Sequence, residues 1–245
     1  MKPKIVVISG LTASGKTDLS ITLAKQFDAE IISADSRQVY QGLDIGSAKI
    51  TPAEQQGVPH HLLDIVDPAT QPHYSVGDFQ RDAYTAIDNI LARGKLPMLV
   101  GGTGLYSRAV INGYGFAQQP NQPRYDVLQI CLVPPNTYLA PRVKLRNTKR
   151  IEHGMFDETR ALLARGVQPE FLYKLGLEYR LNVLHVQGQI DLATYEDELY
   201  HQTMQFIKRQ RTWYRKEDPA LTHYLTDPTT YVAEATQLIA EFLRA

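Results

Sequence analysis

The chain has 245 residues, of which 43% are hydrophobic, and its 26 basic and 26 acidic residues give a formal net charge of zero. This size is typical of one α/β domain with a sizeable core, and the neutral balance argues against unspecific binding to nucleic acid. The single cysteine, Cys131, excludes a disulfide framework, and neither a signal-peptide pattern nor an apolar stretch of about 18 residues occurs, so we expect a cytoplasmic protein without a membrane segment.

The first motif lies at residues 10–17, which read GLTASGKT and match the phosphate-binding pattern G-x-x-x-x-G-K-[ST] completely. The stretch Lys4 to Ser9 predicts a buried strand before it, and Asp18 to Phe27 predicts a helix after it. In this order, backbone N–H groups and the positive end of the helix dipole point at one anion. We expect Lys16 to reach the outer phosphate and the Thr17 hydroxyl to hold Mg²⁺. The residues predicted to bind a diphosphate here are Gly10, Thr12, Ala13, Ser14, Gly15, Lys16 and Thr17.

The rest of the chain alternates between strand and helix patterns. Ser75 and Asp78 form a capping box that opens a helix running to about Arg93. Further strands are predicted at 29–35, 96–100 and 125–133, a long loop at 44–70, a helix start at 105–110, and helices at roughly 140–165, 194–214 and 231–243. We therefore predict a P-loop NTPase-like three-layer α/β fold with a parallel sheet and a helical C-terminal part, as one domain over residues 1–245.

In an open parallel sheet, ligands bind at the carboxyl ends of the strands. We expect the Gly10 loop, Asp35 and the glycine turn 101–104 to meet there. A carboxylate beside a phosphate site suggests a group transfer in which Asp35 orients or deprotonates the acceptor. The strand at 96–100 runs into glycines, whereas a P-loop ATPase usually has an aspartate there. This argues against a motor or switch NTPase and leaves a small-metabolite kinase open.

Two basic segments and one histidine pair complete the candidate residues. Residues 141–150 and 208–216 each carry five basic residues and no acid, which suggests specific anionic sites on a neutral protein. The adjacent His60 and His61 point to different sides of the chain and have no fitting third ligand nearby, so we expect them to be structural.

Four ordered segments resemble the successive signatures of the tRNA dimethylallyltransferases: GLTASGKT, then ADSRQVYQGLDIGSAK (34–49), GVPHHLLDIVDP (57–68) and LVGGTGLY (99–106). The resemblance covers residues 4–110 almost continuously and resumes at 142–146, 154–166 and 208–215 (KRQRTWYR). It implies a P-loop fold that holds a prenyl diphosphate rather than ATP. It also implies transfer of a dimethylallyl group to the exocyclic amine of an adenosine next to the tRNA anticodon.

The resemblance also implies roles for individual residues. Asp35 would accept the proton of the amine, and Thr103 would lie near that amine. Arg142 and Arg146 would bind the diphosphate, with a solvated helix face as the alternative. The residues implied to contact the acceptor are Ser36, Arg37, Gln38, Lys208, Arg209, Gln210 and Arg211, with a solvated basic helix face as the alternative for the cluster 208–216. The implied partners are dimethylallyl diphosphate, Mg²⁺ and tRNA; we expect a monomer, although the sequence does not determine the oligomeric state.

The chain departs from the family pattern in two places. Family members carry a long helical insertion that grips the anticodon stem, where this chain has only the short, turn-rich linker 113–125. LGLEYR (175–180) stands where the family has a Gly-Tyr-Lys-like stretch. The acceptor therefore stays open between tRNA and a free adenine nucleotide (AMP, ADP or ATP). A small-molecule kinase and an inactive paralogue that binds diphosphate or RNA are further alternatives, although the joint presence of Lys16, Thr17, Asp35 and Thr103 favours an active enzyme.

Overall fold

A computed structural model describes residues 2–116, 121–216 and 222–245, and a parallel β-sheet forms its centre. Its six strands run in the order β3-β2-β4-β1-β5-β6. Their bounds are β1 (Lys4–Gly10), β2 (Ala29–Ser33), β3 (His60–His61), β4 (Leu96–Val100), β5 (Asp126–Leu132) and β6 (Thr222–Leu225). The predicted parallel P-loop-type sheet is confirmed. The two outer strands, β3 and β6, were not predicted because they are too short to show a hydrophobic pattern.

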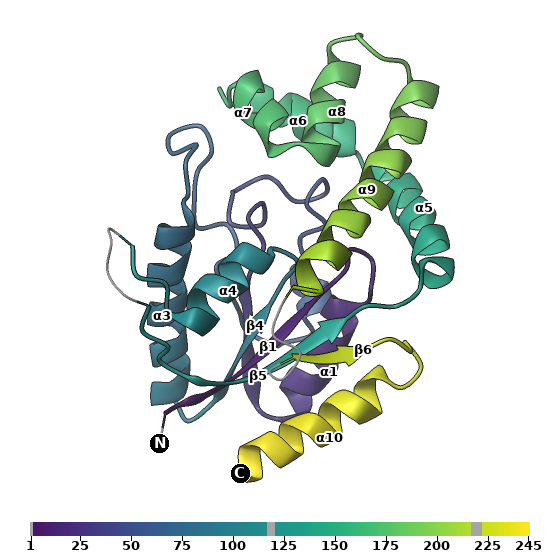
Figure 1. Ribbon diagram of the computed structural model, residues 1–245. Coiled ribbons are helices and arrows are strands. Elements are labelled where there is room, and N and C mark those ends of the chain that lie inside the picture. The colour runs from purple at the N-terminus through teal and green to yellow at the C-terminus, as the bar shows by residue number, and fades with distance from the viewer. Residues whose placement is uncertain (1, 117–120, 217–221) are drawn as a thin grey trace.

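Helices cover both faces of this sheet, with α1 and α10 on one face and α3 and α4 on the other (Figure 1). The helix bounds are α1 (Lys16–Gln26), α2 (Pro52–Gln55), α3 (Val76–Ala92), α4 (Gly104–Asn112), α5 (Asn136–Glu152), α6 (Met155–Ala164), α7 (Pro169–Leu175), α8 (Leu177–Val186), α9 (Leu192–Tyr214) and α10 (Tyr231–Arg244). In the part of the chain that the structure describes, no helix has the length and apolar character needed to span a membrane.

The alternation of side chains along β1 explains the two layers of core. Val6 and Ile8 pack in the cluster that contains α1 and α10, whereas Ile5 and Val7 pack in the cluster that contains α3. All four side chains are fully buried, as expected for a central parallel strand covered on both faces. The predicted capping box of α3 is present, since Ser75 Oγ accepts from the backbone N–H of Asp78 and the Asp78 carboxylate accepts from the backbone N–H of Ser75.

Helices α5 to α9 form a helical layer beyond the carboxyl ends of the strands, and the end of α9 returns to the sheet (Figure 1). The prediction of a single helix at 140–165 is wrong. The chain turns at Gly154, whose φ is 92°, so that two helices, α5 and α6, stand in place of one. Glycine adopts this left-handed conformation without the steric penalty of a Cβ. Helices α7 and α8 were not predicted. Residues 177–183 of α8 are buried except for one position, so the helix has no polar face from which an amphipathic period could be read.

Glycine at position 101 allows the ends of β2 and β4 to approach each other closely. A Cβ at Gly101 would lie 2.1 Å from the carbonyl oxygen of Ala34, which is a backbone atom. The residue after Ala34 is Asp35, so this contact places the predicted base beside the turn that carries Thr103.

We expect Gly101→Ala to lower the free energy of unfolding by about 1–3 kcal/mol, because a backbone shift must make room for the methyl group. Denaturant unfolding followed by circular dichroism measures this loss. Gly77→Ala in the first turn of α3 is the matched control, since a Cβ there meets no atom closer than 3.6 Å. Equal stability of Gly101→Ala and the wild type would contradict the close approach of the two strand ends.

Candidate active site

The P-loop connects β1 to α1 and holds the Lys16 ammonium against its own backbone. Lys16 Nζ donates to the carbonyl oxygens of Gly10 and Leu11 at 3.1 and 2.8 Å. Burial lowers the pKa of Lys16 to about 8, the nearby Asp35 carboxylate opposes this shift, and the Arg146 guanidinium adds to it. The charged form of Lys16 is therefore disfavoured by burial, and an anion bound next to it would stabilise that charge.

Two arginines of α5 lie at the same loop, where the sequence predicted them. Arg142 Nε donates to the carbonyl oxygen of Ala13 at 3.1 Å. Arg146 is more enclosed, and burial together with the Arg150 charge lowers its pKa to about 10. Its Nε atom is buried without a hydrogen-bond partner among the described residues, and so is Ser14 Oγ in the loop itself. Buried donors without partners are uncommon and point to a ligand that would accept from them.

Asp35 and Thr103 come together at the ends of β2 and β4. The backbone N–H of Ser36 donates to Thr103 Oγ1 at 3.2 Å, and Thr103 Oγ1 donates to Ser36 Oγ at 3.4 Å. The backbone N–H of Arg37 donates to Asp35 Oδ1 at 2.9 Å, which leaves the other carboxylate oxygen with no hydrogen bond from the described residues. The predicted base, threonine and phosphate loop thus share one edge of the sheet.

An ion-pair network behind Asp35 was not predicted. Glu178 of α8 accepts from Arg37 at 2.7 Å and from Arg150 at 3.0 Å. Gln38, which was predicted to contact the adenosine substrate, forms a hydrogen bond within the protein: its side-chain oxygen accepts from Ser33 Oγ at 2.8 Å. The glutamate is visible in LGLEYR (175–180), but its arginine partners lie far away in the chain, so no local pattern predicts the network.

The site carries more positive than negative charge. Among the described residues, four cations (Lys16, Arg37, Arg146 and Arg150) lie around two carboxylates, Asp35 and Glu178, and the charges of this cluster contribute to the pKa shifts of Lys16, Arg146 and Glu178. Such an excess of partly or fully buried cations is stabilised when a polyanion binds.

The segment 208–216 at the end of α9 divides into two sets of side chains. Gln210 is buried, accepts from the Thr12 N–H at 2.9 Å and donates to the Gly102 carbonyl at 3.3 Å. Arg211 donates to the Pro134 carbonyl and to Asn136 Oδ1. These two predicted acceptor contacts therefore form hydrogen bonds within the protein itself, whereas Lys208 and Arg209 are exposed.

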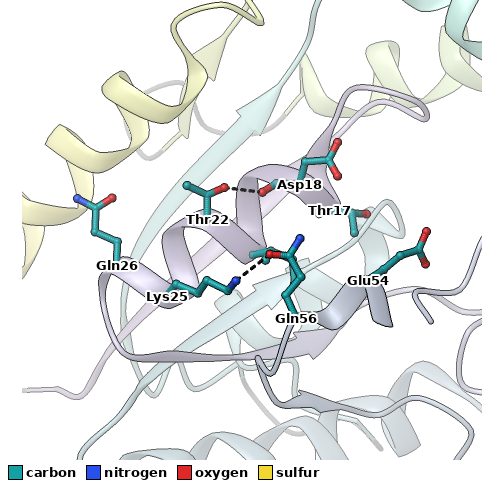
Figure 2. A pocket seen from close by; sticks show the side chains of 8 residues that line it. Thr17, Asp18, Thr22, Lys25, Gln26, Glu54 and Gln56 are labelled. Carbon is teal, nitrogen blue, oxygen red and sulfur yellow. Dashed lines mark hydrogen bonds between the residues drawn. The ribbon is translucent and has the colours of Figure 1, made fainter. Parts of the chain in front are cut away.

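Two hollows have predicted site residues in their walls. One, of about 690 Å³, lies between α8 and α9 and is lined by Arg37, Arg180, His201 and Arg209 among others. The other, of about 570 Å³, follows α1 (Figure 2). Figure 2 shows Lys25 donating to Gln56 across it, and Thr17 is the only predicted site residue in its wall. The second hollow is therefore distinct from the Asp35 site.

Metal ligands of the protein itself are sparse. Within the described ranges, no three His, Cys, Asp or Glu side chains gather as a metal site. His60 Nδ1 contacts the Val58 carbonyl oxygen at 2.8 Å, and His61 Nε2 contacts the Glu30 carboxylate at 2.7 Å, so both rings take part in structural contacts.

A glycine loop between a central parallel strand and a helix, next to several cations and a carboxylate, defines a P-loop α/β protein with a site for a phosphorylated ligand. The family model described as IPP transferase matches residues 38–122 and 115–217, and the one described as isopentenyl transferase matches residues 3–67. The chain belongs to the IPP transferase family.

Individual relatives agree with this membership. The chain is 36% identical over 297 aligned residues to tRNA dimethylallyltransferase 2 of Shewanella sediminis, covering 97% of this chain and 98% of the relative. Because that alignment is longer than 245 residues, the relative contains residues that this chain lacks. The full-length tRNA isopentenylpyrophosphate transferase of Bacillus halodurans is similar in structure with a TM-score of 0.90, 31% identity and 99% and 97% coverage. The tRNA delta(2)-isopentenylpyrophosphate transferase of Staphylococcus epidermidis is similar with a TM-score of 0.87 and 29% identity, and the match covers 98% of this chain and 100% of that structure.

We expect the affinity for inorganic diphosphate to fall as the pH rises through about 8. Protonated Lys16 attracts the anion and the neutral amine does not, so the dissociation constant should rise by up to about tenfold per pH unit above the pKa. Isothermal titration calorimetry between about pH 7 and 9.5 measures this dependence. Lys16→Ala is the control, because it removes the titrating group and corrects for the ionisation of diphosphate. The same pH dependence in both proteins would contradict a role for the Lys16 charge.

Proposed function

We propose that this protein transfers a dimethylallyl group from dimethylallyl diphosphate to the exocyclic amine of an adenosine next to the anticodon of tRNA. The observation that carries the proposal is the juxtaposition of a P-loop rich in cations with Asp35 and Thr103, in a chain of the IPP transferase family. Family membership favours this reaction over a small-molecule kinase with the same loop.

The leaving diphosphate is the chemical reason for the cations. In the reaction, the bond between C1 of the dimethylallyl group and the diphosphate oxygen breaks, and its electron pair stays on the oxygen. Negative charge grows on the diphosphate as positive charge grows on the prenyl carbon. The P-loop N–H groups, Lys16, Arg142 and Arg146 would stabilise that growing charge, and donors held in place before the reaction do so most effectively.

The acceptor side needs a base. The lone pair of the adenosine N6 forms the new bond to C1, and the amine then loses one proton. Asp35 would accept that proton through the carboxylate oxygen that does not bind the Arg37 N–H. Thr103, fixed by its contacts with Ser36, would orient the amine. A positioned base of this kind contributes about 10²–10⁴-fold to the rate.

The donor set near Thr17 fits Mg²⁺. Thr17 is exposed at the start of α1 and offers a hydroxyl oxygen, and Mg²⁺ completes its shell with diphosphate oxygens and water rather than with many protein ligands. When bound there, the ion would neutralise part of the diphosphate charge.

The short linker bears on the choice of acceptor. We infer that 113–125 stands in place of the family's insertion. The two matched segments of the IPP transferase model meet at residues 115–122, which supports this position, although residues 117–120 lie outside the described part of the chain. Without an insertion, affinity for tRNA would depend on exposed cations such as Lys208 and Arg209. The same short linker is the observation that keeps a free adenine nucleotide as the second candidate.

With Mg²⁺ and radiolabelled dimethylallyl diphosphate, we expect label to appear in tRNA and not in AMP. Comparing a tRNA that carries adenosine next to the anticodon with one that carries guanosine there is the matched control. Label on AMP but not on tRNA would replace the proposed acceptor by a free nucleotide. Label on neither, with ATP consumed in the presence of a hydroxyl metabolite, would indicate a kinase.

We expect Asp35→Asn to lower the rate of prenyl transfer by about 10²–10⁴-fold, because the amide cannot accept the proton. Binding of diphosphate should be unchanged or slightly tighter, since a negative charge near Lys16 is removed. Single-turnover kinetics and calorimetry measure the two effects. Asp18→Asn is the control, because Asp18 is exposed and lies in the wall of the α1 hollow (Figure 2). A wild-type rate in Asp35→Asn would exclude Asp35 as the base.

A further inference from the structure

Glu178 is a buried carboxylate that lies between two arginines of the site. Its exposed fraction is 4%, and its oxygens accept from Arg37 at 2.7 Å and from Arg150 at 3.0 Å. Each arginine is held a second time by a carbonyl oxygen, Arg37 by Leu175 at 3.1 Å and Arg150 by Ile45 at 2.8 Å. The glutamate and these carbonyls therefore fix both guanidinium groups in place.

The contact with Arg37 connects Glu178 to the proposed base. Arg37 lies two residues after Asp35, and its backbone N–H donates to Asp35 Oδ1. Its guanidinium group pairs with Glu178 of α8, and Arg37 forms part of the wall of the 690 Å³ hollow. A shift of the Arg37 side chain would thus alter both the hollow and the segment that carries Asp35.

The negative charge of Glu178 also acts on the arginines around it. Arg146 has a buried Nε without a partner among the described residues, and its charge interacts with those of Glu178, Arg37 and Asp35. The three arginine charges hold the pKa of Glu178 down to about 2, so the carboxylate is charged at every pH suitable for the reaction. If Glu178 were neutral, Asp35 would be the one remaining anion among these interacting charges of the described chain. The nearby guanidinium groups would then be drawn towards it.

We propose that Glu178 is a positioning residue for prenyl transfer: it holds Arg37 on α8 and so keeps the Asp35 carboxylate available for the amine proton. This role rests on the proposed function, since it assigns to Asp35 the part of the base. It concerns the catalytic step more than the binding of the donor, because the three cations assigned to the diphosphate, Lys16, Arg142 and Arg146, form no hydrogen bond with Glu178 in the described part of the chain.

The test compares Glu178→Gln with the wild type in kcat, in KM for dimethylallyl diphosphate and in KM for the tRNA acceptor. We expect kcat to fall by about 10- to 100-fold, because a wrongly placed guanidinium pairs with the base, while KM for the donor stays unchanged. Glu158→Gln is the matched control. Glu158 lies in the same helical layer, but it accepts from the backbone N–H groups of residues 44–46 and from Tyr179 rather than from arginine.

A double-mutant cycle with Arg37→Gln identifies the route of the effect. If Glu178 acts through Arg37, adding Glu178→Gln to Arg37→Gln should change kcat by far less than it does in the wild type. Equal losses in both backgrounds would overturn the proposal, and so would an equal loss of kcat in Glu158→Gln. An inactive wild type would instead reject the proposed function, and this role with it.

Glu178→Asp covers the case in which Glu178→Gln does not fold, as judged by circular dichroism and thermal unfolding. It keeps the charge on a shorter side chain, so kcat should fall by a smaller factor with the same unchanged KM for the donor. A wild-type kcat in a folded Glu178→Asp variant would overturn the need for the 2.7 Å contact with Arg37.

Discussion

The arrangement of this protein depends on holding partly or fully buried cations at the carboxyl edge of a parallel sheet. Lys16, Arg37, Arg146 and Arg150 come from three different parts of the chain, yet their charges act on one another. Burying charge without a partner is costly, and the fold provides only some of the necessary anions. The remaining positive charge explains why a diphosphate would bind here and why charge growing on a leaving diphosphate would be stabilised.

A second contact holds the helical layer over this edge. Gln210 joins the P-loop at Thr12 to the turn after β4 at Gly102, and Tyr214 Oη also donates to the Gly102 carbonyl oxygen. The end of α9 is therefore packed against the P-loop and the turn near Thr103, while Lys208 and Arg209 remain exposed just before it. In this way the helix whose exposed cations would bind an RNA is connected by hydrogen bonds to the loop that would bind the prenyl donor.

The parts of the site that sequence reasoning found are those defined by local rules. The glycine loop, the aspartate that follows β2 and the threonine in the turn after β4 each follow a strand directly, and parallel strands bring their carboxyl ends together. The roles of Gln210 and Glu178 could not be read in this way. A basic helix segment resembles a surface for phosphates, so the inward turn of Gln210 and Arg211 is visible only from their contacts. Glu178 lies on a helix without an amphipathic pattern.

The sequence by itself determined the class of fold, the phosphate loop and the family, because glycine geometry, strand periodicity and motif spacing are properties of neighbouring residues. Only the tertiary structure decided which charges neutralise one another. Arg37 and Glu178 are 141 positions apart, and Thr12 and Gln210 are 198 positions apart. Electrostatic and hydrogen-bond energies depend on distances of a few ångströms between atoms. Those distances follow from the packing of α8 against α9 and from the contacts of the end of α9 with the P-loop and the turn after β4, and no local pattern encodes them.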